Sequence, residues 1–365
     1  HGMSERTTEI PIRNVWYMLL YVWDALHVQD RWRAAVEEAP TLDALLARVL
    51  ADQIEQRFRI GMGRDYREEA AERAGIRGRV DFNECIKKMS FRHGRAFCRY
   101  QIFDVDVPRN QIIRSVLTHV AKVGNFGTGQ KKAQELKSRL HSVARAMPGV
   151  SILELKPDLI GRELLKRQDG DYSLMLSICY LLVQRYMPRE KAGDYYLPHA
   201  NRDELSLYDI YEKFVAKFYE HHLTEWTVAL QKTIRWPTEA HSDYVPVMKP
   251  DLTLEHEESG KLIVLDTKFT GASLTGGRWG NTTFNRDHVF QIYAYLRSQE
   301  EESPEHRCST GILLYPTVGH RLSERVKIQG HSIHWETVDL SQPWRGIEAD
   351  LLSIPEVIRM GQGRE

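Results

Sequence analysis

The spacing of hydrophobic positions predicts that the first half of the chain is largely helical. Residues 10–26 are dense in aromatic and aliphatic side chains, which predicts a buried helix with Asn14 as its N-cap. Leucines that recur every three or four positions predict an amphipathic helix over 42–58. The same periodicity predicts further helices over 112–123, 131–146 and 172–186.

Two segments between these helices have a different pattern. Residues 75–82 and 95–107 are predicted to be strands, and polar and apolar positions alternate in the second. The region is locally basic with aromatic side chains between its charges; the cations are Arg77, Arg79, Lys87, Lys88, Arg92, Arg95 and Arg99. Such a surface suits contact with nucleic acid or with an acidic protein, and an ordinary solvated surface is the third interpretation.

The second half alternates between helical and extended patterns. Apolar runs in 249–254 and 262–268 flank the polar turn 255–260, which predicts a β-hairpin. Helices are predicted over 207–219, 287–296 and 344–359, and further strands over 309–315, 326–329 and 332–338.

Proline mixed with polar residues over 195–203 marks a domain boundary. The predicted N-terminal domain, residues 3–195, is α+β, with helices and a β-strand insertion. The predicted second domain, residues 196–365, is α/β, with a mixed sheet flanked by helices.

The balance of charges, the cysteine spacing and the lack of long apolar runs exclude several classes of protein but do not identify a function. Fifty Lys and Arg balance fifty Asp and Glu, which argues against a chain that binds DNA by charge alone and leaves room for a partner that does. The four cysteines lack C-x-x-C spacing and predict neither a zinc site nor a disulfide framework. His1 and Gly2, before Met3, look like a cloning remnant. Because no signal peptide or membrane-spanning run is visible, a cytoplasmic protein is expected.

The end of the predicted hairpin gathers the chemically informative residues. Asp266 and Lys268 are two positions apart in one strand, so their side chains point to the same face, and Asp251 at the start of the other strand is expected beside them. Two carboxylates suit Mg²⁺ or Mn²⁺, and a nearby ammonium can orient or deprotonate an attacking water. Because an isolated D-x-K is more often a solvated strand end, this interpretation depends on the flanking segments.

The arrangement resembles the core of the PD-(D/E)xK nuclease superfamily, with Pro250-Asp251 and Asp266-Thr267-Lys268 as the two halves of its motif. This resemblance implies that the preceding helix supplies a further acidic residue, which matches Glu212. The following helix is similar to the Q-x-x-x-Y helix of the RecB-like branch, through Gln291 and Tyr295. The implied catalytic residues are Asp251, Asp266, Lys268, Glu212, Gln291 and Tyr295, and the implied metal ligands are Asp251, Asp266 and Glu212.

A longer series of motifs resembles the McrC family, the endonuclease subunits of McrBC-type modification-dependent restriction systems. In chain order the motifs are 11–19, 75–82, Pro250-Asp251, 266–268 and 311–316. The resemblance implies that the N-terminal half binds a hexameric McrB-like AAA+ GTPase and stimulates its GTP hydrolysis, with Arg77 and Arg79 as candidate contacts. It also implies cleavage of double-stranded DNA that contains modified cytosine, in defence against foreign DNA.

Two questions stay open at this point. The glycine-rich segment 270–281 has no phosphate-loop signature, and it either contacts the DNA backbone through Arg278 or is disordered. Because the sequence contains no nucleotide-binding motif, GTP is expected to act only through the partner. The alternative function is a non-enzymatic activator of a AAA+ NTPase with a vestigial nuclease fold; the intact set of Asp251, Asp266, Lys268 and Glu212 favours the enzyme.

Overall fold

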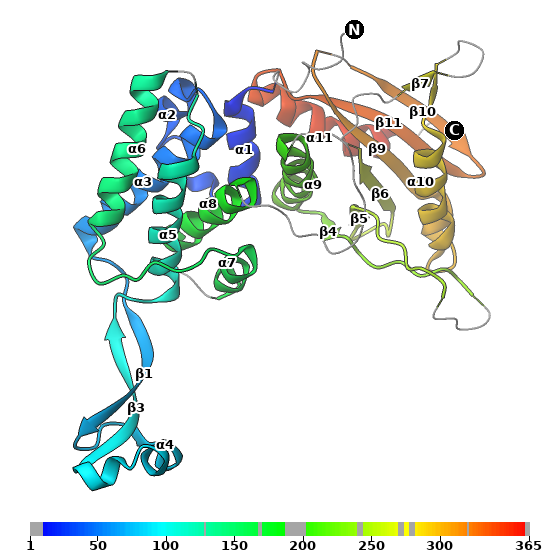
Figure 1. Ribbon diagram of the computed structural model, residues 1–365. Coiled ribbons are helices and arrows are strands. Elements are labelled where there is room, and N and C mark those ends of the chain that lie inside the picture. Colours follow the sequence, from blue (N-terminus) through cyan, green and yellow to red (C-terminus); the bar gives the residue numbers. More distant parts are fainter. Residues whose placement is uncertain are drawn as a thin grey trace. The chain divides into compact units, whose positions relative to one another are not determined.

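The computed structural model describes residues 10–127, 129–166, 170–186, 202–238, 244–268, 274–276, 282–319 and 321–361 (Figure 1). The described residues fall into two compact units. One is Asp30–Tyr196, and the other joins His1–Gln29 to Leu197–Glu365. No helix in these described ranges has both the length and the apolar character needed to cross a membrane.

The first helix, α1 (Ile12–Val22), groups with the C-terminal half of the chain, in contrast to the predicted domain of residues 3–195. Tyr21 of α1 packs edge-on against Phe214 of α9 (Arg202–His222), with ring centroids 5.5 Å apart. The helix is buried, as its apolar density predicted, but its hydrophobic cover comes from residues that lie far away in the sequence.

The predicted N-cap of this helix is wrong. Pro11 occupies the N-cap position, and Asn14 lies inside the first turn. The buried Asn14 amide instead donates hydrogen bonds to the backbone oxygens of Leu340, at 2.8 Å, and Gln342, at 2.9 Å. Asn14 therefore satisfies carbonyl groups of a distant loop, a use that local capping rules do not predict.

The Asp30–Tyr196 unit is built mainly from helices, and each helix predicted in this region from hydrophobic spacing is present. The predicted helices are α3 (Leu42–Ile60), α5 (Pro108–Val123), α6 (Gln130–Arg145) and α8 (Gly170–Tyr186). The unit also contains α2 (Arg33–Glu38) and α7 (Pro157–Leu164), which were not predicted. Arg139 of α6 joins Asp52 and Glu55 of α3 at 2.6 and 2.7 Å. Apolar faces and this ion-pair network hold the helices together.

A two-stranded antiparallel ribbon extends the same unit, formed by β1 (Asp65–Ala74) and β3 (Arg95–Asp104) (Figure 1). The strand predicted over 75–82 is mostly wrong, because only β2 (Arg79–Val80) pairs with β3. The chain turns at Gly78, whose φ is +69° and where a Cβ would lie 2.3 Å from a backbone oxygen. Strand β1 was not predicted, because its polar and charged residues lack the apolar alternation of a half-buried strand.

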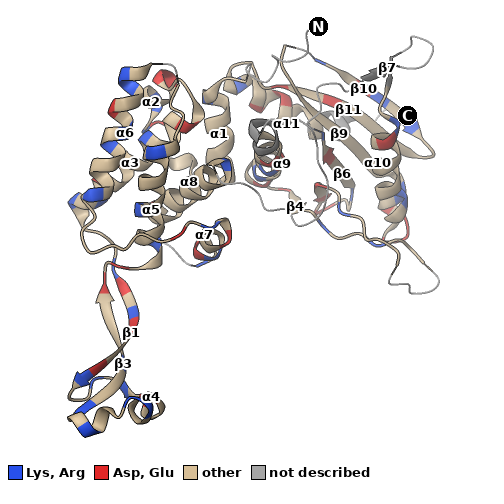
Figure 2. Cartoon of the chain, in the orientation of Figure 1, with Lys and Arg blue, Asp and Glu red and all other residues tan. Residues whose placement is uncertain are grey.

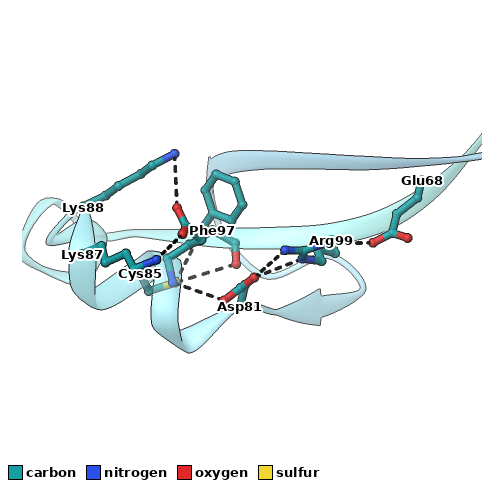
Figure 3. Close-up of polar contacts among 8 residues, drawn as sticks. Glu68, Asp81, Cys85, Lys87, Lys88, Phe97 and Arg99 are labelled. Carbon is teal, nitrogen blue, oxygen red and sulfur yellow. Dashed lines mark hydrogen bonds and ion pairs between the residues drawn. The ribbon is translucent and has the colours of Figure 1, made fainter.

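The connection between the two ribbon strands, residues 75–94, is called the ribbon tip. It contains the short helix α4 (Phe82–Lys87), and Asp81 caps this helix by accepting from the Glu84 backbone N–H at 3.2 Å. Asp81 also pairs with Arg99 of β3 at 2.9 Å (Figure 3). A small core of Cys85, Ala96, Cys98 and Tyr100 supports the tip.

Buried polar groups fix the base of the ribbon to the helices. The Asn110 amide of α5 donates to the backbone oxygens of Gly63 at 2.8 Å and Val105 at 2.7 Å, which flank β1 and β3. Tyr172 of α8 donates to Asn110 and accepts from the Gly63 backbone N–H. Because unsatisfied buried polar groups are costly, this network holds both ribbon strands at their origin.

The other unit contains a six-stranded mixed sheet in the order β10-β11-β9-β6-β5-β4. Its strands are β4 (Trp226–Leu230), β5 (Leu252–His256), β6 (Leu262–Thr267), β9 (Thr310–Thr317), β10 (Ser323–Ile328) and β11 (His331–Asp339). Strands β6, β9 and β11 are parallel, and β4, β5 and β10 pair antiparallel with their neighbours. The mixed sheet and the β5–β6 hairpin confirm the sequence prediction, whereas β4 was not predicted.

Helices cover this sheet, with α10 (Arg286–Ser298) on one face and α9 and α11 (Trp344–Gly361) on the other (Figure 1). Gly311 in β9 permits the close approach of α10, because a Cβ there would meet the Ile292 side chain at 2.7 Å. Strands β7 (Leu274–Gly276) and β8 (Thr282–Phe284) pair with each other within the segment between β6 and α10. Arg278, the residue of interest in the glycine-rich segment, lies outside the described residues.

Candidate active site

The β5–β6 hairpin brings Asp251 to the end of β6, as its register predicted. Leu252 pairs with Leu265, so Asp251 at the start of β5 lies beside Asp266 and Thr267. The Thr267 backbone N–H and hydroxyl both donate to Oδ2 of Asp251, each at 2.7 Å. Two hydrogen bonds on one oxygen fix the orientation of this carboxylate.

Asp266 and Lys268 project to the same face at the end of β6 and form an ion pair. The Asp266 side chain is buried, with an exposed fraction of 1% for the residue. Burial, followed by the negative charge of Asp251, raises the pKa of Asp266 to about 6, against the opposing effect of Lys268. Asp266 is therefore a buried carboxylate whose charged form is disfavoured by burial and by Asp251 and favoured by Lys268.

Helix α10 orients Lys268 through a chain of hydrogen bonds. The Lys268 ammonium donates to Oε1 of Gln291 at 2.9 Å, and the Gln291 amide donates to the Tyr295 hydroxyl at 2.7 Å. The Tyr295 hydroxyl in turn donates to the backbone oxygen of Lys249 at 3.4 Å. Gln291 and Tyr295 thus lie where the sequence placed them, and they connect the lysine to the segment that leads into Asp251.

Glu212 on α9 approaches the site from the Asp251 side. Its carboxylate accepts a hydrogen bond from the Gln231 amide at 2.8 Å. Burial, and then the charge of Asp251, raise the pKa of Glu212. Among the described residues, no group of three or more His, Cys, Asp or Glu side chains lies close enough to hold a metal ion. The metal-ligand set of Asp251, Asp266 and Glu212 therefore stays a prediction.

Sequence reasoning missed several residues around the site. Tyr208 lies one turn before Glu212 on α9, and the charges of Asp251, Glu212 and Asp266 add to the effect of burial in raising its pKa. His288 of α10 shares a hydrogen bond of 2.9 Å with the Tyr315 hydroxyl. The four-residue spacing between Tyr208 and Glu212 was a usable signal. The contacts of His288 with β9 and of Gln231 with α9 join segments that local spacing does not connect.

The raised pKa of Asp266 predicts how stability depends on pH. Its folded pKa of about 6 lies above the ordinary value of 3.8, so the folded state binds more protons than the unfolded chain between these values. The free energy of unfolding therefore falls as the pH rises through this window. In metal-free buffer, Asp266→Asn is expected to be more stable than the parent by about 2–3 kcal/mol above pH ~6, and the difference should vanish near pH ~4.

Urea unfolding at a series of pH values measures this difference. Asp287→Asn, an exposed carboxylate on α10, is the matched control and should leave the pH profile unchanged. A variant at Asp266 that is less stable than the parent above pH ~6 would show that burial does not raise this pKa.

Comparisons with known proteins agree with the resemblance noted in the sequence. A family model described as "McrBC 5-methylcytosine restriction system component" matches residues 4–316. The chain is similar to the Type IV methyl-directed restriction enzyme EcoKMcrBC of Escherichia coli (strain K12), with 29% identity over 351 residues, which are 94% of this chain and 97% of that relative.

A solved structure is similar in fold. It is a chain of the refined half-complex from a tetradecameric assembly of Thermococcus gammatolerans McrB AAA+ hexamers with bound McrC, with a TM-score of 0.53 and 14% identity. The match covers 97% of this chain and 78% of that chain. Because the family match spans most of the sequence, the chain belongs to the family of McrBC 5-methylcytosine restriction system components.

Proposed function

We propose that this chain is the endonuclease subunit of a modification-dependent restriction system and hydrolyses phosphodiester bonds in DNA. The observation that carries the proposal is the arrangement of Asp251, Asp266 and Lys268 at one end of the β5–β6 hairpin, with Gln291 of α10 on the lysine. This arrangement supports a PD-(D/E)xK nuclease core. A merely solvated strand end would not bury Asp266 beside a second carboxylate.

The donor set fits a hard divalent cation. Asp251 and Asp266 offer carboxylate oxygens, the ligands that Mg²⁺ and Mn²⁺ prefer, and burial followed by the charge of Asp251 raises the pKa of Asp266, so a bound cation would favour its charged form. Glu212 is the third carboxylate near this pair. A cation held there would supply Lewis-acid polarisation of a phosphate oxygen.

The side chains of the chain itself have separable roles in this proposal. Lys268, held by Gln291, orients the attacking water and offsets the charge that develops on the phosphate. Thr267 holds the Asp251 carboxylate in one orientation. Gln291 and Tyr295 are positioning residues, because they reach the reacting atoms only through Lys268.

We further propose that the chain acts with a hexameric McrB-like AAA+ GTPase and that their DNA substrate contains modified cytosine. The names of the similar proteins, a methyl-directed restriction enzyme and a complex of McrB hexamers with McrC, support this pairing. In the proposal the partner hydrolyses GTP and this chain stimulates that hydrolysis.

The ribbon tip is the part of the chain that we assign to this partner. Large apolar side chains are exposed there: Ile76 at 75%, Phe82 at 65%, Ile86 at 70%, Met89 at 54% and Phe91 at 53%. Lys and Arg residues gather around α4 and the adjoining ends of the ribbon (Figure 2). Clustered exposed apolar side chains are typical of protein interfaces, so a protein partner explains the tip better than DNA does.

Four of the basic residues singled out in the sequence have no carboxylate partner among the described residues: Arg77, Arg79, Arg92 and Arg95. Lys87 and Lys88 pair with Glu84, at 3.1 and 3.7 Å (Figure 3). The Arg77 guanidinium lies 4.6 Å from the centre of the Tyr100 ring, an interaction that keeps its charge at the surface. Arg77 and Arg79 therefore remain the proposed contacts to an acidic surface of the partner.

Lys268→Ala tests the proposed chemistry. In the complex with the partner, Mg²⁺ and modified DNA, the variant is expected to cleave at least about a hundredfold more slowly, because it loses the group that orients the water. Its fold should be retained, as circular dichroism would show, but its unfolding midpoint near neutral pH should fall, because the buried Asp266 carboxylate loses its ion-pair partner. Lys261→Ala, at the opposite end of the same strand, should cleave normally. Equal cleavage rates for Lys268→Ala and the parent, or full cleavage in excess EDTA, would refute the proposed mechanism.

A further inference from the structure

The connection between β4 and β5 forms two paired arms that lead away from the active site. We call residues 230–238 and 244–249 the β4–β5 arms (Figure 1). Ile234 and Met248 exchange backbone hydrogen bonds of 2.8 and 2.9 Å, and both side chains are buried in the core beneath α10. The Trp236 indole N–H donates to the backbone oxygen of Pro246 at 3.1 Å. These bonds pair the two arms with each other at Ile234–Met248 and at Trp236–Pro246.

The arms begin at the residues assigned to catalysis. The Gln231 backbone N–H donates to the backbone oxygen of Asp251 at 2.9 Å, and the Gln231 side chain donates to Glu212. The Lys249 backbone oxygen accepts from Tyr295. Any molecule that binds along the arms therefore lies next to Asp251, Glu212 and Tyr295.

The exposed surface of the arms alternates cations with aromatic and aliphatic groups. Lys232, Arg235 and Lys249 are exposed, and within the described ranges of the arms there is neither an acidic residue nor an ion pair to these three. The Tyr244 side chain is 97% exposed and that of Trp236 is 40% exposed. Cations that contact phosphates, with rings that contact sugars and bases, form a recurrent nucleic-acid surface.

The position of these cations has an electrostatic reason. The site gathers the carboxylates of Asp251, Asp266 and Glu212 around the ammonium of Lys268, and these negative charges would repel the phosphates on either side of the bond to be cleaved. Cations on the paired arms beside the site offset this repulsion where the DNA enters.

We propose that the β4–β5 arms bind the DNA duplex beside the cleaved phosphodiester, with Lys232, Arg235 and Lys249 on backbone phosphates and Trp236 and Tyr244 on sugars and bases. This inference rests on the proposed nuclease function and names the surface that holds its substrate. The contacts set affinity and the register of cleavage, and the chemistry itself belongs to the hairpin residues.

The test combines Lys232→Ala, Arg235→Ala and Tyr244→Ala in the full chain. Binding to a fluorescent duplex is measured by anisotropy in Ca²⁺, at several salt concentrations. The variant is expected to bind at least tenfold more weakly, and the slope of log K against log salt should shrink by about 2, because two phosphate contacts are lost. Arg325→Ala with Arg345→Ala, two exposed cations elsewhere in this unit, is the control and should leave both values unchanged.

Two further measurements separate this inference from the proposed function. Hydrolysis of bis(p-nitrophenyl) phosphate, which is too small to reach the arms, should be equal in the parent and the variant. The exchange Lys232→Arg with Arg235→Lys keeps both charges and should retain DNA affinity.

Unchanged affinity and salt slope in the triple variant, or no DNA binding by the parent, would overturn the inference. Loss of partner binding with unchanged DNA affinity would assign the arms to a protein instead. A parent that binds DNA through the arms but hydrolyses neither substrate, even with its partner, would refute only the nuclease.

Discussion

Asp266→Ala is expected to lower DNA cleavage by at least a thousandfold while the AAA+ partner's GTP hydrolysis is still stimulated. The substitution removes a carboxylate that the proposal assigns to the metal, and such a loss corresponds to about 4 kcal/mol of transition-state stabilisation. The stimulating surface is assigned to the ribbon tip, which lies in the other compact unit. Cleavage of methylated DNA and GTP hydrolysis are measured on the same reconstituted complex.

The matched control for this variant is Asp287→Ala. Asp287 is an exposed carboxylate in the first turn of α10, four positions before Gln291, and its loss should leave both activities intact. If folded Asp266→Ala loses cleavage and stimulation together, the proposed division of roles between the two units is wrong. If it keeps full cleavage, Asp266 is not a metal ligand.

Arg77→Glu combined with Arg79→Glu is expected to reduce stimulation of GTP hydrolysis at least tenfold and to reduce cleavage with it. Both residues lie at the ribbon tip without a carboxylate partner among the described residues, so charge reversal opposes an acidic partner surface directly. Cleavage falls because the nuclease is no longer delivered to DNA by the motor. GTP turnover, complex formation and cleavage are measured together.

Folding must be separated from binding in this variant, because Arg77 lies over the Tyr100 ring. Circular dichroism and the unfolding midpoint are compared with those of the parent, and the lost cation–π contact should cost only about 0.5–1 kcal/mol. Lys131→Glu with Lys132→Glu reverses two exposed charges on α6 of the same unit and serves as the control. Full stimulation by the double variant at the tip would remove Arg77 and Arg79 from the partner interface.

Local sequence alone determined the hairpin and the chemistry at its end. A short polar turn between two apolar runs leaves few ways to pair the strands, so Asp251 was correctly placed beside Asp266. The alternation of side chains along a strand placed Asp266 and Lys268 on one face of the sheet. Helical spacing placed Gln291 and Tyr295 on one face of the following helix. These features depend only on periodicity, and for that reason the mixed sheet and most of the helices were also predicted.

Tertiary structure alone decided which distant groups complete the site and the fold. The bonds from Lys268 to Gln291 and from Gln231 to Glu212 join segments that no local rule connects. The β1–β3 ribbon escaped the sequence analysis because β1 lies largely in solvent and therefore lacks the apolar alternation by which strands are recognised. Helix α1, with Asn14, groups with the C-terminal half of the chain because it buries its apolar side chains and forms hydrogen bonds there. Such contacts depend on distance in space, whereas hydrophobic periodicity reports only on residues that are close in the sequence.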